Sequence, residues 1–241
     1  TIENHLILRS QVYVMSSAII DLDDVKKIYK MGDTTVEALK GSNVEIQEGE
    51  FVAVMGPSGS GKSTLMNMIG ALDTPSSGEV YVGDESISDL GEDELALLRS
   101  KKIGFIFQQF NLIPSMNATE NVALPMLFRG VNKNERTERA EKILTRVGLG
   151  ERLHHMPSEL SGGQRQRVSI ARSLANDPDI ILADEPTGNL DSETGESIMD
   201  LLTELNEEGK TIIMVTHDEN DAEYADRIIK IVDGKTGIEN K

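Results

Sequence analysis

A short glycine-rich segment constrains what this chain can fold into more than any other feature of its sequence. Residues 56–64 read Gly-Pro-Ser-Gly-Ser-Gly-Lys-Ser-Thr and match the pattern G-x-x-x-x-G-K-[ST]. The segment follows the apolar run 51–55, typical of a buried strand, and leads into residues 62–72, which have helical character. This order predicts backbone N–H groups that converge on an anion at the start of a helix.

The residues of this loop indicate that the anion is a phosphate chain. Glycines tolerate unusual backbone angles and let phosphates approach the main chain closely. Lys62 is expected to reach the β- and γ-phosphates, and the hydroxyl of Ser63 is expected to ligate Mg²⁺. A glycine-rich turn without a ligand is the alternative, but the flanking strand and helix favour phosphate binding. The expected phosphate contacts are Gly56, Ser58, Gly59, Ser60, Gly61, Lys62, Ser63 and Thr64.

A second motif places two carboxylates at the end of another apolar strand. Residues 180–185 read Ile-Ile-Leu-Ala-Asp-Glu. In a parallel sheet the carboxyl ends of the strands line the ligand crevice, so this pair is expected beside the glycine-rich loop. Asp184 would then hold Mg²⁺ through water, and Glu185 would polarise an attacking water. On its own, the pair would be interpreted as a solvated acidic turn before Pro186.

Strand-like and helix-like segments alternate along much of the chain. This alternation predicts an α/β fold with a mainly parallel sheet and helices on both faces. Residues 47–50 are expected to form a hairpin turn, and the helices within 111–158 indicate an inserted helical subdomain. Strands are expected at 18–25, 51–55, 79–82, 103–107, 180–183, 211–215 and 227–232, and helices at 92–99, 118–127, 134–147, 162–176, 193–206 and 219–225.

Composition narrows the choice of partners and excludes some chemistry. With 24 Lys and Arg against 41 Asp and Glu, the 241-residue chain has a formal charge of −17, which disfavours nucleic acid as a partner. The absence of cysteine excludes disulfides, thiolate metal sites and a cysteine nucleophile. No stretch reaches the ~18 apolar residues needed to span a bilayer. Residues 1–17 are expected to be a leader or an added extension, since Met15 resembles a natural start.

The segment 160–164 points to a family. It reads Leu-Ser-Gly-Gly-Gln, and here the sequence resembles the nucleotide-binding domain of ABC transporters, whose signature is LSGGQ. The resemblance covers nearly the whole chain from about Ala18 onward. Ser161, Gly162 and Gly163 open a helix, so they offer N–H groups and a hydroxyl to an anion. A serine N-cap with flexible glycines is the alternative, which the motifs on either side disfavour.

This resemblance implies a fold and an activity. The fold is a P-loop NTPase core with a mainly parallel sheet, an N-terminal antiparallel β subdomain and an inserted α-helical subdomain at about 109–165, within one domain over 18–241. The activity is hydrolysis of ATP with Mg²⁺. Two copies associate head to tail, so that each ATP lies between the P-loop (residues 56–64) of one copy and the signature segment (residues 160–164) of the other, with contacts from Ser161, Gly162, Gly163 and Gln164.

Other residues match further elements of the family. Tyr29 resembles the aromatic residue that stacks on adenine. Gln108 resembles the glutamine that links the Mg²⁺ site to the helical subdomain, with the adjacent Gln109 as the alternative. Asp191 is similar to the aspartate of the D-loop, and His217 resembles the switch histidine that contacts the γ-phosphate and the attacking water. The resemblance thus implies catalysis by Lys62, Glu185 and His217, and metal binding by Ser63, Gln108 and Asp184.

Several segments narrow the resemblance to one group of transporters. Residues 30–32, 107–114, 120–122 and 184–191 are similar to the macrolide-export and lipoprotein-release group. This implies a separate integral membrane permease as partner, and a subunit that is cytoplasmic and peripheral on the inner face of the membrane. An importer subunit, a soluble ABC ATPase of DNA repair or translation and a P-loop nucleotide kinase are the alternatives. The single cassette without a long coiled coil disfavours the soluble ATPases, and the signature segment disfavours the kinase.

Overall fold

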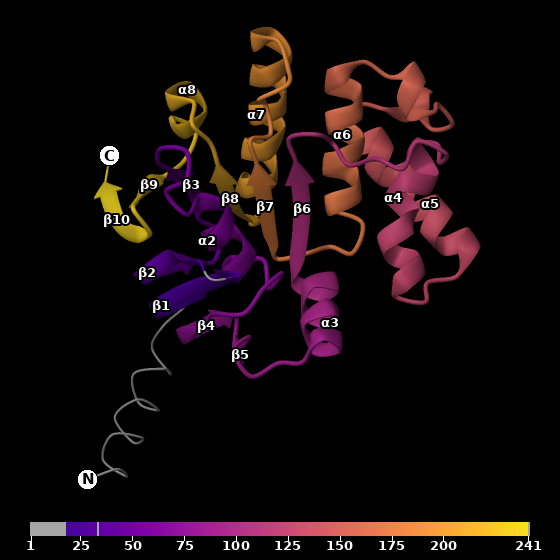
Figure 1. Ribbon diagram of the computed structural model, residues 1–241. Coiled ribbons are helices and arrows are strands. Elements are labelled where there is room, and N and C mark those ends of the chain that lie inside the picture. The colour runs from indigo at the N-terminus through magenta and orange to yellow at the C-terminus, as the bar shows by residue number, and fades with distance from the viewer. Residues whose placement is uncertain (1–17, 33, 241) are drawn as a thin grey trace.

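Two β-sheets organise the part of the chain that the structure describes (Figure 1). The structure is a computed structural model that describes residues 18–32 and 34–240, so the predicted leader over 1–17 lies outside the described residues. The smaller sheet is antiparallel, with its strands in the order β2-β1-β4-β5. These strands are β1 (Ala18–Met31), β2 (Thr34–Gln47), β4 (Ser77–Val82) and β5 (Glu85–Ser86).

The larger sheet has six strands in the order β10-β9-β3-β8-β7-β6. Neighbouring strands from β9 to β6 run parallel, and β10 pairs antiparallel with β9 at one edge. The predicted α/β class is therefore confirmed, with a mainly parallel sheet beside an N-terminal antiparallel one. The strands are β3 (Phe51–Met55), β6 (Ile103–Phe107), β7 (Ile180–Asp184), β8 (Thr211–Val215), β9 (Arg227–Val232) and β10 (Lys235–Asn240).

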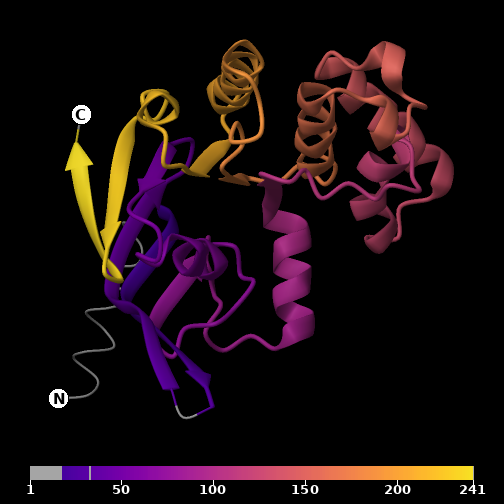
Figure 2. The same cartoon turned by 45° about the horizontal axis from the view of Figure 1, so that its top comes forward.

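The helices divide into those that cover the sheets and a group that stands apart. Helices α4, α5 and α6 lie together beside β6, on the side of the molecule away from β10 (Figures 1 and 2). In the part of the chain that the structure describes, every helix is too short or too polar to span a bilayer. The helices are α2 (Lys62–Ile69), α3 (Glu92–Lys102), α4 (Ala118–Phe128), α5 (Lys133–Arg146), α6 (Gly162–Ser173), α7 (Ser192–Glu207) and α8 (Glu219–Ala222), with 3-10 turns at Gly150–Arg152 and Pro157–Glu159.

Alternate side chains of the central strands enter two different cores. Val52 and Val54 of β3 face the core shared with the smaller sheet, α2 and α3. Phe51 and Ala53 face the core shared with α4 to α7. Strands β7 and β8 divide their residues in the same way. Because both faces are buried, these strands are continuous apolar runs, which is why their positions are evident in the sequence.

The predicted hairpin around residues 47–50 is wrong. The chain turns there, but β2 pairs with β1 while β3 pairs with β8 and β9 in the other sheet. Parallel strands occupy both edges of β3, so no edge remains for β2. Arg227 of β9 ties the turn down by donating to the Glu50 carboxylate. Burial alone would raise the pKa of Glu50, but hydrogen bonds from Arg227 and the backbone N–H of Gln47 outweigh it and hold that pKa below its usual value.

The antiparallel strands are longer than predicted. β1 was expected to end at residue 25, yet it runs to Met31 and pairs with β2 out to Thr34. This outer part of the hairpin is largely exposed and polar, so it leaves no apolar run in the sequence. The sequence of the edge strand β10, Lys-Thr-Gly-Ile-Glu-Asn, also contains no apolar run, so this strand was not expected.

The parallel register brings the carboxyl ends of four strands to one edge of the larger sheet. Asp184 of β7 is opposite Val215 of β8 and Phe107 of β6, and Val54 of β3 is opposite Val215. The residues that follow these positions emerge side by side. This edge therefore gathers the P-loop, the acidic pair and the two segments that carry the predicted glutamine and histidine.

Candidate functional site

The P-loop connects β3 to α2 and is pressed between two other strands. A Cβ at Gly56 would lie 2.1 Å from the carbonyl oxygen of Ile231 in β9, and one at Gly61 would lie 2.6 Å from that of Ala38 in β2. Gly61 also has a φ of +109°, in the left-handed region that side chains disfavour. The loop requires glycine at both positions to keep this shape.

Helix α2 begins without a side-chain cap. Its N-cap residue is Gly61, and its first turn contains no acidic residue. The first N–H groups and the positive end of the helix dipole therefore remain available to an anion. The Lys62 ammonium lies along the loop and donates to the carbonyl oxygens of Gly56 (2.6 Å) and Pro57 (3.0 Å). The loop thus concentrates positive charge within an acidic chain.

A pocket of about 660 Å³ opens over the P-loop. Val36 and Lys40 of β2 form part of its wall. Ser60 differs from the other predicted loop contacts, because its side chain is buried inside the loop and its hydroxyl has no hydrogen-bond partner in the described part of the chain. The predicted site residues that line the pocket are Gly56, Ser58, Gly59, Gly61, Lys62, Ser63, Thr64, Asp184, Glu185 and His217.

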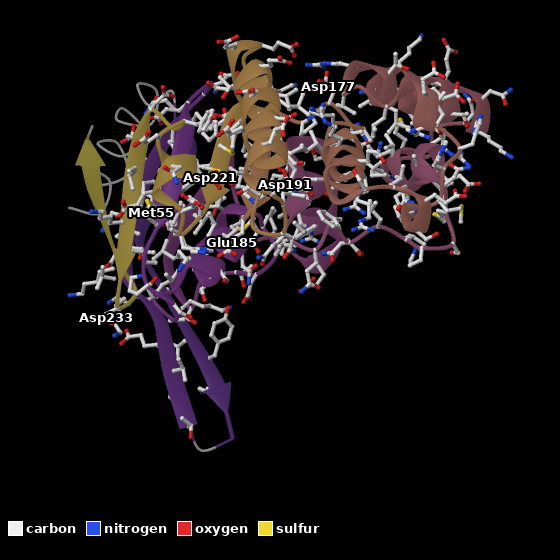
Figure 3. The ribbon with its side chains drawn as sticks, turned by 90° about the horizontal axis from the view of Figure 1, so that it is seen from above. Met55, Asp177, Glu185, Asp191, Asp221 and Asp233 are labelled. Atoms are coloured by element: carbon white, nitrogen blue, oxygen red, sulfur yellow. The ribbon has the colours of Figure 1, made fainter. Side chains whose placement is uncertain are left out.

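The two carboxylates of the acidic pair have different environments. Burial raises the pKa of Asp184, the nearby Glu185 carboxylate adds to the rise, and Lys62 opposes it. Glu185 has a φ of +44°, an unusual value for a residue with a side chain. Its N–H donates to Val215 (2.8 Å), and its Oε1 lies 3.0 Å from His217 Nδ1. Seen from above, Glu185 lies in the middle of the molecule (Figure 3).

The pocket offers the oxygen ligands that Mg²⁺ prefers. The Ser63 hydroxyl and the Asp184 carboxylate both line it. Among the described residues, no group of three or more His, Cys, Asp or Glu side chains could hold an ion alone. This donor set fits a Mg²⁺ that takes most of its ligands from water and phosphate oxygens, as is usual in nucleotide sites.

Gln108, the third predicted metal ligand, does not line the pocket. It packs against the loop after Glu185, where its Nε2 lies 2.7 Å from the position of a Cβ at Gly188. Asn189 of the same loop donates to the Gln108 carbonyl oxygen (2.8 Å). The alternative residue, Gln109, is exposed. A role for Gln108 at the metal stays a prediction, which its contact with this loop favours over Gln109.

The signature segment begins α6 and lies outside the pocket of its own chain. None of its residues is among those that line the pocket. Ser161 caps the helix by accepting from the Gln164 N–H (3.2 Å), while the Gln164 side chain accepts from the Ser161 N–H (2.9 Å). A Cβ at Gly163 would lie 2.4 Å from the methyl group of Thr194, so the helix start fits closely against α7.

Asp191 caps α7 beside this helix start. It accepts hydrogen bonds from the Thr194 N–H (3.0 Å) and the Thr194 hydroxyl (2.8 Å). These bonds lower the pKa of Asp191. Thr194 thus contacts both the predicted D-loop aspartate and the signature glycine.

Tyr29 of β1 also lies outside the pocket lining. Its hydroxyl donates to Asp73 (3.1 Å), and Lys27 binds the other oxygen of the same carboxylate (2.5 Å). Burial raises the pKa of Tyr29, Asp73 adds to the rise, and hydrogen bonds with Thr64 and Asn67 oppose it. The ring therefore lies beside α2, and its stacking on adenine stays a prediction.

Arg172 connects α6 to the segment after Gln108, and this contact was not predicted. It donates to the carbonyl oxygens of Phe110 (2.8 Å) and Asn111 (2.5 Å), in the segment after Gln108. Arg165 stacks over the Phe110 ring at 5.3 Å. A basic residue near a helix end usually complements the helix dipole, so nothing in the sequence pattern indicated this contact.

An apolar groove of about 620 Å³ lies between α3, β6 and the α4–α6 group. Phe128 lines it and is 80% exposed, and Leu72 is 47% exposed. Arg172 and Asn111 also line it, so the groove borders the segment after Gln108. Apolar surface exposed to this extent is typical of a contact site for another protein.

Known proteins resemble this chain over most of its length. Residues 39–188 match the family described as ABC transporter. The chain is 56% identical over 227 residues to the uncharacterized ABC transporter ATP-binding protein MJ0796 of Methanocaldococcus jannaschii, over 92% of this chain and 97% of that protein. It is 53% identical over 221 residues to the macrolide export ATP-binding/permease protein MacB of Wolinella succinogenes, over 92% of this chain and 34% of MacB.

The fold is shared with a solved structure of one of these relatives. The dimeric structure of a post-hydrolysis state of the ATP-binding cassette MJ0796, bound to ADP and Pi, matches this chain with a TM-score of 0.84 and 54% identity. The match covers 92% of this chain and 98% of that one. The likeness therefore extends well beyond the P-loop, over both sequence and fold.

Proposed function

Because this chain belongs to the ABC transporter family and is the ATP-hydrolysing subunit of such a transporter, we propose that two copies hold each ATP between the P-loop of one and the signature segment of the other. One observation carries this proposal. The pocket over the P-loop contains the acidic pair and His217 but none of the signature residues. The start of α6 has the chemistry of an anion site, and a second copy would bring it to the open side of that pocket.

In this arrangement the P-loop binds the triphosphate and offsets its charge. The loop N–H groups face the phosphates, and Lys62 exchanges its carbonyl partners for the β- and γ-phosphates. Ser63 and Asp184, with Gln108 from the adjacent segment, would hold Mg²⁺. When bound, Mg²⁺ supplies further charge neutralisation at the phosphates.

Glu185 acts as the general base in this scheme. Its carboxylate takes the proton from a water that attacks the γ-phosphorus in line, while the bond from that phosphorus to the bridging oxygen of ADP breaks. His217, 3.0 Å from Glu185, holds the carboxylate in orientation toward the γ-phosphate. The signature segment of the second copy covers the site and excludes bulk water, which strengthens the electrostatic interactions inside it.

The Glu185→Gln variant tests the proposal. It should keep ATP binding but lose hydrolysis, so the ATP-bound pair should persist. Size-exclusion chromatography should show a dimer with ATP and Mg²⁺ and a monomer with ADP. Glu219→Gln, which neutralises an exposed carboxylate of α8, should hydrolyse ATP like the unaltered chain. A Glu185→Gln variant that stays monomeric at saturating ATP would contradict the proposal.

A membrane partner completes the proposed function. The apolar groove between α3 and α4 is the proposed docking site for a membrane permease, which makes this subunit peripheral on the cytoplasmic face of the membrane. Because Arg172 lines the groove and also holds the segment after Gln108, movement at the nucleotide would reach the permease. Similarity to MacB, a macrolide export ATP-binding/permease protein, favours an export or lipoprotein-release system over import.

Two charge substitutions test this docking site. Phe128→Asp should prevent co-purification with the permease, because it places a charge in the groove. Leu97→Asp charges an exposed leucine of α3 that does not line the groove, and it should co-purify normally. Equal behaviour of the two variants would place the permease elsewhere.

A further inference from the structure

Gln166 on α6 makes a buried contact that the roles above leave unexplained. Its side chain is fully buried, and its Nε2 donates to the carbonyl oxygen of Pro186 at 2.6 Å. Its Oε1 is also buried and has no hydrogen-bond partner among the residues that the structure describes. A buried amide oxygen without a partner is unfavourable, and a methionine would fill similar space without it. The hydrogen bond to Pro186 therefore accounts for glutamine at this position.

Pro186 directly follows Glu185, the proposed base. Glu185 has a left-handed φ of +44°, and a residue before proline is already restricted sterically. Its backbone is held on two sides, because its N–H donates to Val215 (2.8 Å) and its carbonyl oxygen accepts from Gly188 (3.1 Å). Gln166 adds a third restraint on the next peptide, and this restraint comes from a different element.

Helix α6 carries both Gln166 and the end of the signature segment. Ser161 and Gln164 begin the helix, and Gln166 lies in its first two turns. Gly163, on the same buried face as Gln166, fits against the Thr194 methyl group. A displacement of the helix start is therefore transmitted along a short rigid segment to the Pro186 carbonyl.

We propose that Gln166 is a positioning residue for Glu185, which it orients through the Pro186 carbonyl and couples to the position of the signature helix α6. This inference rests on the proposed function, since it takes Glu185 as the base and the start of α6 as a contact for the ATP of the second copy. It adds a connection, within one chain, between Glu185 and the start of α6. Each copy then adjusts its own base when it contacts the ATP cradled by its partner.

Two substitutions at Gln166 separate this role from simple packing. Gln166→Met keeps much of the volume but donates no hydrogen bond, so kcat should fall about tenfold while KM for ATP changes less than about twofold. In Gln166→Glu the introduced carboxyl is buried, and only its protonated form can donate to the Pro186 carbonyl. The kcat of this variant, relative to the unaltered chain, should therefore rise as the pH falls from about 8.5 to about 6.

The pH profile and a second buried site provide the controls. The relative kcat of Gln166→Met should stay constant over the same pH range. Ser169 is fully buried on the same helix, and its hydroxyl has no hydrogen-bond partner in the described part of the chain. Ser169→Ala should therefore keep kcat within about twofold. An unchanged kcat in Gln166→Met, or a flat relative profile for Gln166→Glu, overturns the proposal.

Variants in the Glu185→Gln background distinguish this inference from the proposed function. If Glu185→Gln alone forms no dimer with ATP, the proposed function fails regardless of Gln166. If it does, Glu185→Gln combined with Gln166→Met should dimerise at an ATP concentration within about threefold of that for the single variant. If Glu185→Gln dimerised and the double variant did not, Gln166 would act on assembly of the site rather than on Glu185. That result would overturn the inference.

Discussion

The two helices that the proposed ATP site uses, α2 and α6, begin in opposite ways. α2 starts after Gly61, which has no side chain to cap the first N–H groups. α6 starts after Ser161, which exchanges hydrogen bonds with Gln164 in a capping box. The first helix start depends on the loop that β2 and β9 press into place, whereas the second has a capping box of its own at the Ser161 and Gln164 N–H groups.

This difference separates nucleotide binding from pairing. The start of α2 has N–H groups that its N-cap residue leaves uncapped, and a lysine, so one chain already presents a site that favours the phosphates. The start of α6 is stable without an anion and lies outside the pocket of its chain. Binding of ATP should therefore be a property of a single copy, and contact with the signature segment should be a second, weaker step.

Removing the cation of the P-loop should give the largest effect. Lys62→Ala should weaken ATP binding on the order of 100-fold, because charged hydrogen bonds contribute about 1.5–3 kcal/mol each. Isothermal titration calorimetry on the single chain measures this loss. Lys40→Ala, which removes a charge from the wall of the same pocket, should cost less than about fivefold. Equal losses of ATP affinity in the two variants would mean that the overall charge of the pocket binds the phosphates. The start of α2 would then make no specific contribution.

Charging the start of α6 should stop pairing but leave ATP binding intact. Asp and Asn cap helices about as well as Ser, so Ser161→Asp and Ser161→Asn should both preserve α6. Only the aspartate places a negative charge against the triphosphate held by the second copy. In the Glu185→Gln background, Ser161→Asp should weaken the ATP-dependent dimer by about 30-fold or more, and Ser161→Asn by less than about threefold.

Analytical ultracentrifugation with ATP compares the dimers of these two variants, and calorimetry compares ATP binding by their single chains. Both variants should bind ATP as single chains like the unaltered protein. If the Ser161→Asp and Ser161→Asn variants formed equally strong dimers, the start of α6 would not contact the triphosphate of the second copy. Loss of ATP binding in the single chain would show that α6 belongs to the pocket of its own chain.

The half of the site that consists of the P-loop, the start of α2 and the acidic pair (the α2 half) is the part that the sequence predicts best. Its determinants are local, because the P-loop joins consecutive elements and the acidic pair ends a strand buried on both faces. Such strands appear as continuous apolar runs, and their parallel register fixes which ends meet. The predicted positions of Lys62, Ser63, Asp184, Glu185 and His217 around one pocket follow from that register.

The contacts that the sequence did not predict join segments far apart in the chain. Gln166 lies between Gly163 and Ile170 on the buried face of α6, so a polar residue on that face was a signal that it had a partner. Its partner, Pro186, lies on a loop of another element, which periodicity cannot identify. The hairpin predicted at 47–50 was wrong for a similar reason, because the partners of β3 are β8 and β9 rather than β2, its neighbour in sequence.

Asp221 should give the smallest effect. It is 9% exposed on α8 and accepts a hydrogen bond from the hydroxyl of Thr187, in the loop after Glu185. Burial raises the pKa of Asp221, Asp218 adds to the rise, and Thr187 and His217 oppose it. A carboxyl with a raised pKa in the folded state contributes stability below its unfolded pKa and loses it as the pH rises through the folded value.

Asp221→Asn removes this loss and keeps an acceptor for Thr187. Its free energy of unfolding, relative to the unaltered chain, should therefore increase from about pH 4.5 to about pH 7.5, by a few tenths to about 1 kcal/mol. Thermal unfolding should show this as a rise in Tm of at most about 2–4 °C. ATP affinity should stay the same, because the α2 half of the site is held by the P-loop glycines and the strand register. If ATP affinity changed together with stability, the α2 half of the site would depend on the charge at Asp221. This half would then not be independent of the rest of the molecule.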